Sequence, residues 1–212
     1  MKESTWDTGY KFLTADMKSK NGDSGVWKMG EWKKHEDELV MCESGFHYCK
    51  KSIEAFEYVY GDALVVVEAR GKSETEGNKT VVAEMRVIKR VDTKKVSVQF
   101  AIACARRCLP NYEKAYPKDD RPRKAIDAAE AWCLNPTEET ALAARSAASA
   151  ALSAARSAAE SAAWSAWSAW SAAWSAALSA ARSASAERKW QNETLKSIIE
   201  ESPPMIEHEE GL

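Results

Sequence analysis

The segment CESGFHYC brings two thiols and an imidazole close together in the chain. Cys42, His47 and Cys49 could ligate a metal ion, or a cysteine could act as a nucleophile beside a histidine base. The spacing of the two cysteines is not the short Cys-x2-Cys knuckle of structural zinc sites, and a fourth ligand and an orienting group are missing nearby. We therefore expect neither a metal nor a catalytic residue here, and we take His47 as a candidate contact for a ligand or partner.

A second set of distinctive side chains lies in an Ala/Ser-rich stretch toward the C-terminal end. Its unit Ser-Ala-Ala-x, sometimes shortened to Ser-Ala-x, places a larger residue at every third or fourth position, which is the period of an α-helix. On a helix these positions fall within an arc of about 120°. The candidate binding residues in this stripe are Trp164, Trp167, Trp170, Trp174, Arg145, Arg156 and Arg182.

Three interpretations of the tryptophan stripe stay open. Aromatic side chains at helical spacing usually belong to a core. They can also form a platform on which a flat ligand such as a nucleobase stacks, with the arginines holding phosphate or carboxylate groups. The third interpretation is an interface between proteins. A helix from 137 to 202, a stretch without Gly or Pro, would extend about 100 Å, so we expect either a fold-back or a homodimer or higher oligomer that covers it.

The elements that must position these residues follow two different patterns. Up to residue 92, short apolar runs alternate with glycines and polar stretches, which predicts a small mixed α/β module. One expected strand places Val81, Ala83, Met85 and Val87 on a single face. The expected elements are strands at 9–13, 63–69 and 80–91, a helix over 50–59 capped by Ser52, and a polar loop over 71–79.

From residue 93 the apolar period becomes helical. A first helix places Val96, Phe100 and Ala103 on one face and is expected to stop at Pro110. A second helix begins with Asp119 or Asp120 as its cap and Pro122 in its first turn, and it ends at Asn135 and Pro136. The fold class is thus α+β, with an α/β module over 1–92, an Ala/Ser/Trp-rich long-helix region over 93–202 and an acidic tail over 203–212.

The bulk composition argues against several classes of function. A net charge of −2 gives no general attraction to nucleic acid, and the uncharged run 161–181 is too poor in strongly apolar residues for a membrane span. No phosphate loop or glycine fingerprint predicts a cofactor. The N-terminal residues are polar, and the five cysteines form no regular framework, so we expect a cytoplasmic protein.

Two resemblances add to these patterns. The stretches YKFLTADM, CESGFHYC, ALVVVEARG and NKTVVAEMRVI resemble a domain of uncharacterised function found at the start of many phage and prophage proteins, over residues 9–91. The stretch CLPNYEKAYPKDDRPRKAIDAAEAW, with the alanine-rich helices after it, resembles an immunity-protein family of bacterial polymorphic-toxin systems. That second resemblance implies a helical fold that neutralises a toxin, and it makes Arg121, Arg123 and Trp132 candidate contacts for the partner.

Together the resemblances imply a non-enzymatic, phage-encoded inhibitor in the host bacterial cytoplasm. Its partner would be a bacterial defence effector or toxin, or the nucleotide signal of such an effector. One alternative is a structural or oligomerisation protein of a phage. Another is an enzyme, because GFHYCKKSIEAFEYVYGDALVVVEARG resembles the middle of ADP-ribosyltransferase folds, for which Glu84 is the available late-strand glutamate.

Overall fold

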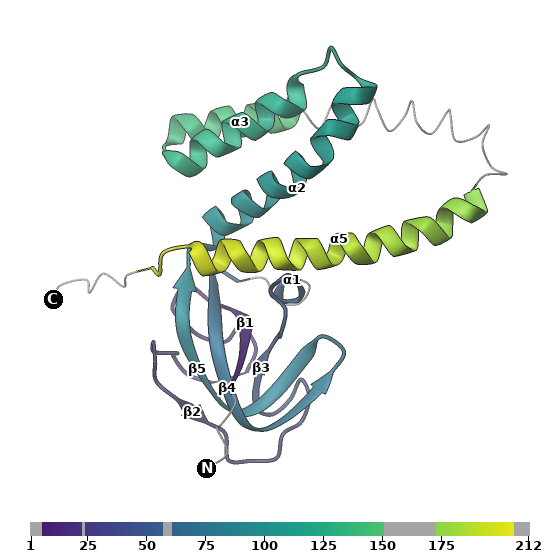
Figure 1. Ribbon diagram of the computed structural model, residues 1–212. Coiled ribbons are helices and arrows are strands. Elements are labelled where there is room, and N and C mark those ends of the chain that lie inside the picture. Colours follow the sequence, from purple (N-terminus) through teal and green to yellow (C-terminus); the bar gives the residue numbers. More distant parts are fainter. Residues whose placement is uncertain (1–5, 23, 57–60, 151–172, 206–212) are drawn as a thin grey trace. The chain divides into compact units, whose positions relative to one another are not determined.

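The computed structural model describes residues 6–22, 24–56, 61–150 and 173–205, without the side chains of 173–185 (Figure 1). It divides into two compact units. The sheet unit comprises Met1–Val96 and Leu195–Leu212, and the helical unit comprises Ser97–Thr194. An antiparallel sheet followed by helices confirms the predicted α+β fold class.

The sheet unit contains a five-stranded antiparallel sheet in the order β1-β4-β5-β2, with β3 also paired to β5. The strands predicted at 9–13, 63–69 and 80–91 are confirmed. The predicted loop over 71–79 is wrong, because β4 and β5 run on to a two-residue turn at Gly77, whose φ of 58° suits a tight hairpin. The strands are β1 (Asp7–Leu13), β2 (Lys33–Lys34), β3 (Phe46–Tyr48), β4 (Ala63–Glu76) and β5 (Lys79–Val91).

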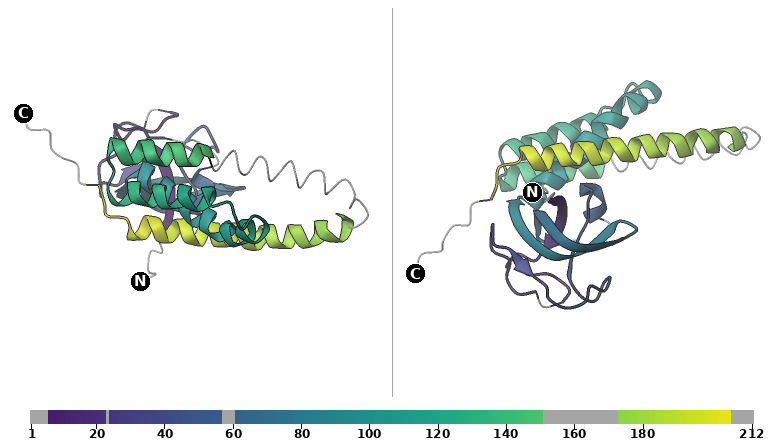
Figure 2. Two further views of the ribbon diagram at one scale, coloured as in Figure 1. Left: turned by 90° about the horizontal axis from the view of Figure 1, so that it is seen from above. Right: turned by 60° about the horizontal axis from the view of Figure 1, so that its bottom comes forward.

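A short contact between β1 and the end of β3 closes the strands into a ring (Figure 2). The Tyr10 N–H donates to the Cys49 carbonyl at 2.8 Å, and the Cys49 N–H donates back at 2.9 Å. Apolar side chains fill the inside of this ring. Gly9 is needed at the contact, since a Cβ there would lie 2.1 Å from Cδ2 of Tyr48. The inner cluster consists of Leu13, Met17, Trp27, Tyr48, Ala63, Val65, Val67, Ala69, Val82, Met85 and Val87.

Two local predictions in this unit need correction. The helix expected over 50–59 is described only as α1, Ser52–Ala55, and residues 57–60 lie outside the described residues. Lys51, and not Ser52, occupies the N-cap position, and Ser52 is fully buried. On β5, Val81, Met85 and Val87 are buried as expected, whereas Ala83 is only half-buried and Val82 is buried as well. An irregularity of β4 between Arg70 and Ser73, opposite Ala83, shifts the alternation there.

The C-terminal end of α5 (Ala173–Glu201) belongs to the sheet unit. Leu195 and Ile199, one helical turn apart, are both fully buried. Lys89 on β5 donates to the carbonyls of Ile199 and Glu200, at 2.7 Å each, which satisfies two acceptors that a helix end leaves free. The C-terminal end of α5 is therefore attached to β5 of the sheet.

The helical unit contains α2 from Ser97 onward, α3 (Arg121–Leu134), a helix over 138–150 and α5 up to Thr194. The predicted face of Val96, Phe100 and Ala103 does not form its core, since Val96 belongs to the sheet unit and the other two are half-buried. Positions spaced three and four apart on α2 pack against α3 instead. This core consists of Ile102, Leu109 and Ile126, with Val98, Ala105, Ala129 and Cys133 packed against it.

Pro110 does not stop the first helix. Helix α2 runs over Thr93–Ala115 with Pro110 inside it, although proline removes one backbone hydrogen bond. The start of α3 holds the turn after the proline, because the Tyr112 hydroxyl donates to Asp119 Oδ2 at 2.7 Å and Arg123 Nε donates to Glu113 Oε1 at 2.8 Å. These contacts favour the helical path of residues 111–115.

Two neighbouring arginines on α2 show whether the helices on either side of the alanine-rich stretch can belong to one straight helix. Arg106 pairs with Glu130 on α3, and Arg107 pairs with Glu187 on α5, each at 2.5 to 2.7 Å. Glu187 therefore lies near α3 and near the start of the helix that follows it. A straight helix from 138 to 187 would separate its ends by about 70 Å. The helix over 138–150 and α5 are therefore not parts of one straight helix.

Candidate functional site

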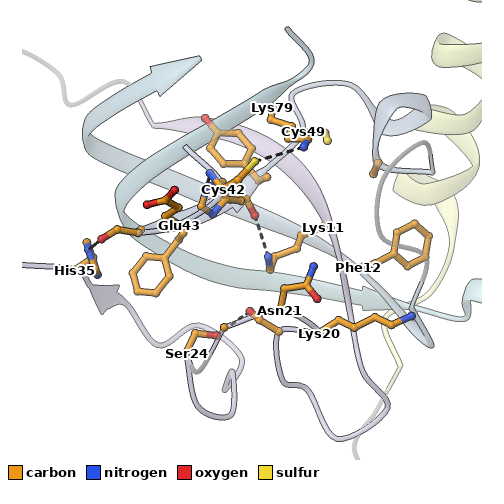
Figure 3. A pocket seen from close by; sticks show the side chains of 18 of the residues that line it. Lys11, Phe12, Lys20, Asn21, Ser24, His35, Cys42, Glu43, Cys49 and Lys79 are labelled. Atoms are coloured by element: carbon orange, nitrogen blue, oxygen red, sulfur yellow. Dashed lines mark hydrogen bonds between the residues drawn. The ribbon is translucent and has the colours of Figure 1, made fainter. Parts of the chain in front are cut away.

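The sheet unit contains a cavity of about 550 Å³ (Figure 3). Its wall is built from β1, residues 19–22 and 24 after β1, the 42–49 segment and the first residue of β5. The predicted ligand contact His47 lines this cavity, together with Cys42 and Cys49. A volume in this range is typical of pockets that hold small molecules.

Lys11 extends from β1 into the cavity and is only half-exposed. Its ammonium donates a hydrogen bond to the His47 carbonyl at 3.0 Å, so it ties β1 to β3 through a side chain (Figure 3). Burial lowers the pKa of Lys11 to about 8, outweighing the opposite effect of nearby Cys49. This amine therefore changes charge near neutral pH, unlike an ordinary lysine.

His47 holds the turn of the 42–49 segment. The Cys42 N–H donates to Nε2 of His47 at 2.8 Å, so that nitrogen must be the unprotonated one. Burial and the charges of Lys11 and Lys79 lower the pKa of His47. Cys42 itself has a φ of 66°, which is rare for a residue other than glycine. The imidazole is thus neutral at physiological pH and braces a left-handed turn.

The two thiols of the segment have different surroundings. Cys42 is exposed, and its Sγ lies 3.5 Å from the ammonium of Lys79. Cys49 is buried, and burial raises its pKa to about 11, so it remains a neutral thiol at physiological pH. Within the ranges that the structure describes, no group of three or more His, Cys, Asp or Glu residues could hold a metal ion. The 42–49 segment therefore contributes polar groups to the wall of the cavity and one accessible thiol, that of Cys42.

Sequence reasoning singled out the 42–49 segment but missed the lysines around it. Among the residues that the structure describes, Lys11, Lys20 and Lys79 line the cavity together with the carboxylate of Glu43. A signal for Lys11 was present in GYKFL, because alternation on a strand places it on the same face as Gly9 and the buried Leu13. The other two lysines could not be assigned to the site without the strand pairing.

The structure places the predicted partner contacts of the α3 region in local ion pairs. Arg121 donates to both carboxylate oxygens of Asp119, at 2.8 and 2.6 Å, and these bonds hold the pKa of Asp119 well below its usual range. The Arg121 N–H also donates to Asp119, so Asp119 and not the N-cap residue Asp120 satisfies the helix start. Arg123 is paired with Glu113, and Trp132 is buried.

The predicted stripe is described only at its edges. Arg145 is exposed on the helix over 138–150. The positions whose side chains lie outside the described residues are Trp164, Trp167, Trp170, Trp174, Arg156 and Arg182. The roles assigned to the stripe and the expected homodimer therefore stay predictions.

Two family models match the chain. Residues 88–181 match an "Imm-5 like putative immunity protein". Residues 8–99 match a domain of unknown function, DUF7666. Both predicted resemblances are confirmed, and the immunity-type match supports an inhibitor role in general terms. No curated protein and no solved structure matches the chain.

Glu84, the residue on which the ADP-ribosyltransferase hypothesis depends, does not line the cavity. It accepts a hydrogen bond from Arg70 Nε at 2.8 Å, and that guanidinium lies over the Trp32 ring at 4.0 Å. The geometry therefore gives this hypothesis no support.

The described side chains of the helical unit include two large apolar ones that are open to solvent. Leu134 at the end of α3 is 88% exposed, and Leu142 on the next helix is 65% exposed. Among the described residues, no helix is both long and apolar enough to cross a membrane. Exposed leucines on a helical unit of this type are candidates for contact with another protein.

Proposed function

We propose that the chain is a non-enzymatic inhibitor whose helical unit binds and neutralises a bacterial toxin or defence effector. The observation that carries this proposal is the match of residues 88–181 to an immunity-type family. Immunity proteins act by binding, so the activity resides in a surface and needs no catalytic group. The partner class follows from the family, and the contact surface follows from the geometry below.

Cross-helix ion pairs support a preformed binding surface. Single surface pairs contribute little stability, but several that link different helices restrict how those helices move against one another. A rigid surface loses less conformational entropy when it binds. The pairs are Arg106–Glu130, Arg107–Glu187 and Arg123–Glu113, and Arg107 also lies 4.3 Å from the ring of Trp190.

The contact surface of the proposal centres on Leu142 and Arg145. They lie three residues apart on one helix, so their side chains are neighbours on its surface, and both are exposed. Leu134 lies just before the short link to that helix. Arginine beside apolar side chains is typical of protein interfaces. The tryptophan stripe extends this surface in the proposal.

The finer setting is also proposed. The chain is encoded by a phage and acts in the host cytoplasm against a bacterial defence, which the phage-type resemblance of residues 9–91 supports. A protein effector is the favoured target, and the nucleotide signal of such an effector is the alternative. Native mass spectrometry of the same preparations also tests for a second copy of the chain.

Neutralisation in cells tests the inhibitor proposal. The full chain is co-expressed in a bacterial host with each of a panel of inducible polymorphic-toxin domains and nucleotide-signalling defence effectors, and surviving colonies are counted. We expect survival to rise at least 100-fold for one effector, and Leu142→Asp or Arg145→Glu to abolish the rescue. The matched control is Val26→Asp, at an exposed apolar residue of the sheet unit. Rescue that both surface variants retain would contradict the surface, and no rescue across the panel would contradict the function.

A further inference from the structure

The Ser44 hydroxyl and the His35 imidazole form a contact that the inhibitor function does not use. Ser44 Oγ lies 2.7 Å from Nε2 of His35, and both side chains are half-buried. In the tautomer with its proton on Nδ1, His35 accepts the hydrogen bond from the hydroxyl. A serine with a basic nitrogen at this distance has the arrangement of an activated nucleophile, because the base can take the proton as the oxygen attacks.

The sheet brings the two side chains together because two short strands meet along one edge of β5. Strand β2 ends opposite Glu84, and the next residue, His35, donates its backbone N–H to the Ala83 carbonyl at 2.8 Å. Strand β3 begins with Phe46 opposite Val82, the adjacent position on β5. The rings of His35 and Phe46 meet edge to face, with their centroids 6.1 Å apart. The end of β2 therefore places His35 beside the turn that precedes β3.

Ser44 lies at the end of that turn, and the backbone of the turn is held at several points. Val40 and Ser44 exchange backbone hydrogen bonds of 3.0 and 2.9 Å, and the Glu43 N–H also donates to the Val40 carbonyl at 3.0 Å. Within the turn, the Cys42 N–H donates to Nε2 of His47 at 2.8 Å. The hydroxyl is thus presented on a fixed backbone, which lowers the entropic cost of reaching the geometry for attack.

The residue after Ser44 supplies a donor for the negative charge that develops during such an attack. Gly45 has a φ of 107°, and a Cβ there would lie 2.6 Å from Cγ2 of Val81 and 2.8 Å from Cδ2 of Leu39, so a larger residue does not fit. Among the hydrogen bonds of the described residues, none has the Gly45 N–H as its donor. A backbone N–H directly after a nucleophile is a common donor to an oxyanion.

We propose that Ser44 is an acyl-acceptor site that reacts with an activated carboxylic ester, with His35 as the base. The Ser44 oxygen forms a bond to the acyl carbon, and the bond from that carbon to the alcohol oxygen breaks. His35 takes the hydroxyl proton and passes it to the leaving alcohol, so no further reactant is needed. One transfer of an acyl group to the protein is not turnover. This site therefore goes beyond the inhibitor function and does not depend on it.

Acetylation of the full chain by 4-nitrophenyl acetate tests the site. Release of 4-nitrophenolate gives the rate, and peptide mapping by mass spectrometry locates the acetyl groups. We expect Ser44 to be acetylated at least about 100-fold faster than Ser73, an exposed serine of β4, since general-base catalysis contributes about 10²–10⁴-fold. Neutral hydroxylamine removes an acetyl group from the thiol of Cys42 and leaves serine esters in place, so the two products are distinguished.

Three variants distinguish a base from a structural contact. Ser44→Ala should abolish the fast phase of 4-nitrophenolate release. His35→Gln should slow acetylation of Ser44 at least about 100-fold, because glutamine can keep a hydrogen bond to the hydroxyl but cannot take its proton. The matched control is Ser73→Ala, which removes the same hydroxyl at an exposed position and should leave the fast phase unchanged.

The results that would overturn the proposal are equally specific. Equal rates at Ser44 and Ser73 in the wild-type chain would do so, as would equal rates at Ser44 in the wild type and in His35→Gln. Fast acetylation confined to Cys42 or Lys11 would also contradict it. If His35→Gln fails to fold, the ratio of the Ser44 and Ser73 rates in the wild-type chain carries the test, and a ratio that unfolding in urea leaves unchanged would refute the proposal.

Discussion

The burial of Leu195 gives the sharpest test of how this fold is assembled. Leu195 lies near the end of α5 and is fully buried in the sheet unit, although about a hundred residues separate it from β5. Leu195→Ala removes three carbon atoms from a packed site. At about 0.8 kcal/mol for each buried methylene, the transfer term alone is about 2.4 kcal/mol, and the cavity left behind adds to it. We expect a loss of about 3 kcal/mol in the free energy of unfolding of the sheet unit.

The chain provides a matched control for this substitution. Leu142→Ala makes the same chemical change at a helical residue that is 65% exposed, and it should change stability by less than about 0.5 kcal/mol. Because the chain has two compact units, one unfolding midpoint would mix their contributions. Hydrogen exchange read by mass spectrometry on peptides from β4 and β5 reports the sheet unit alone.

The expected exchange rates follow from the free energy. A loss of about 3 kcal/mol corresponds to about 150-fold faster exchange for amides that open only when the unit unfolds, since 1.4 kcal/mol is a factor of ten. Peptides from β4 and β5 should show this change in Leu195→Ala and no change in Leu142→Ala. Equal, small effects of the two substitutions would refute the assignment of the α5 end to the core of the sheet unit.

Two further predictions concern single side chains. Asp119→Asn should destabilise the helical unit at neutral pH, because Arg121 and Tyr112 lower the pKa of Asp119 in the folded state. The difference in stability between the variant and the wild type should be full above about pH 4 and shrink as the pH falls further. Thermal unfolding at several pH values checks this, and a difference that stays constant with pH would contradict it. Under native conditions Cys42 should react with a maleimide before Cys49, which is buried and has a pKa of about 11, and peptide mapping that found equal labelling would contradict this order.

The strands of this protein could be predicted where one face of a strand is buried. Alternation in residues 80–91 and the apolar run of 63–69 both correspond to strands, because half of their side chains enter the core. The outer part of the hairpin, from Gly71 to Glu76, is exposed on both faces, so its sequence shows no alternation and predicts a loop. Backbone pairing and a two-residue turn hold that part, and polar composition does not reveal them.

Helix limits failed where tertiary contacts outweighed a local rule. Pro110 is a valid stop signal for an isolated helix, since its ring removes a hydrogen bond and crowds the preceding turn. In the folded chain, Tyr112 is held by Asp119 just before α3 and Glu113 by Arg123 within it, and both partners lie beyond the single helical turn that the proline rule considers. The alanine-rich stretch shows the same limit, because its period predicts helix but not where the chain reverses.

The candidate cavity could be predicted only in part. The 42–49 segment was recognisable because cysteine, histidine and glycine are unusual so close together. The lysines of its wall were not, because Lys11, Lys20 and Lys79 are ordinary surface residues by type. Their convergence depends on which strands pair. It also depends on two contacts of β1: the backbone bridge from Tyr10 to Cys49, just after β3, and the hydrogen bond from the Lys11 ammonium to the His47 carbonyl.

The two family matches and the two compact units divide the chain differently. The first match ends at residue 99 and the second at 181, whereas Leu195, Ile199 and the carbonyls that Lys89 caps lie beyond both. A sheet unit cut at the end of its own match would expose the apolar surface that these two residues cover. The same helix, α5, carries Glu187, which Arg107 holds in the helical unit. Helix α5 therefore contributes residues to both units, and a chain cut anywhere before Leu195 would lack the two residues that cover the sheet.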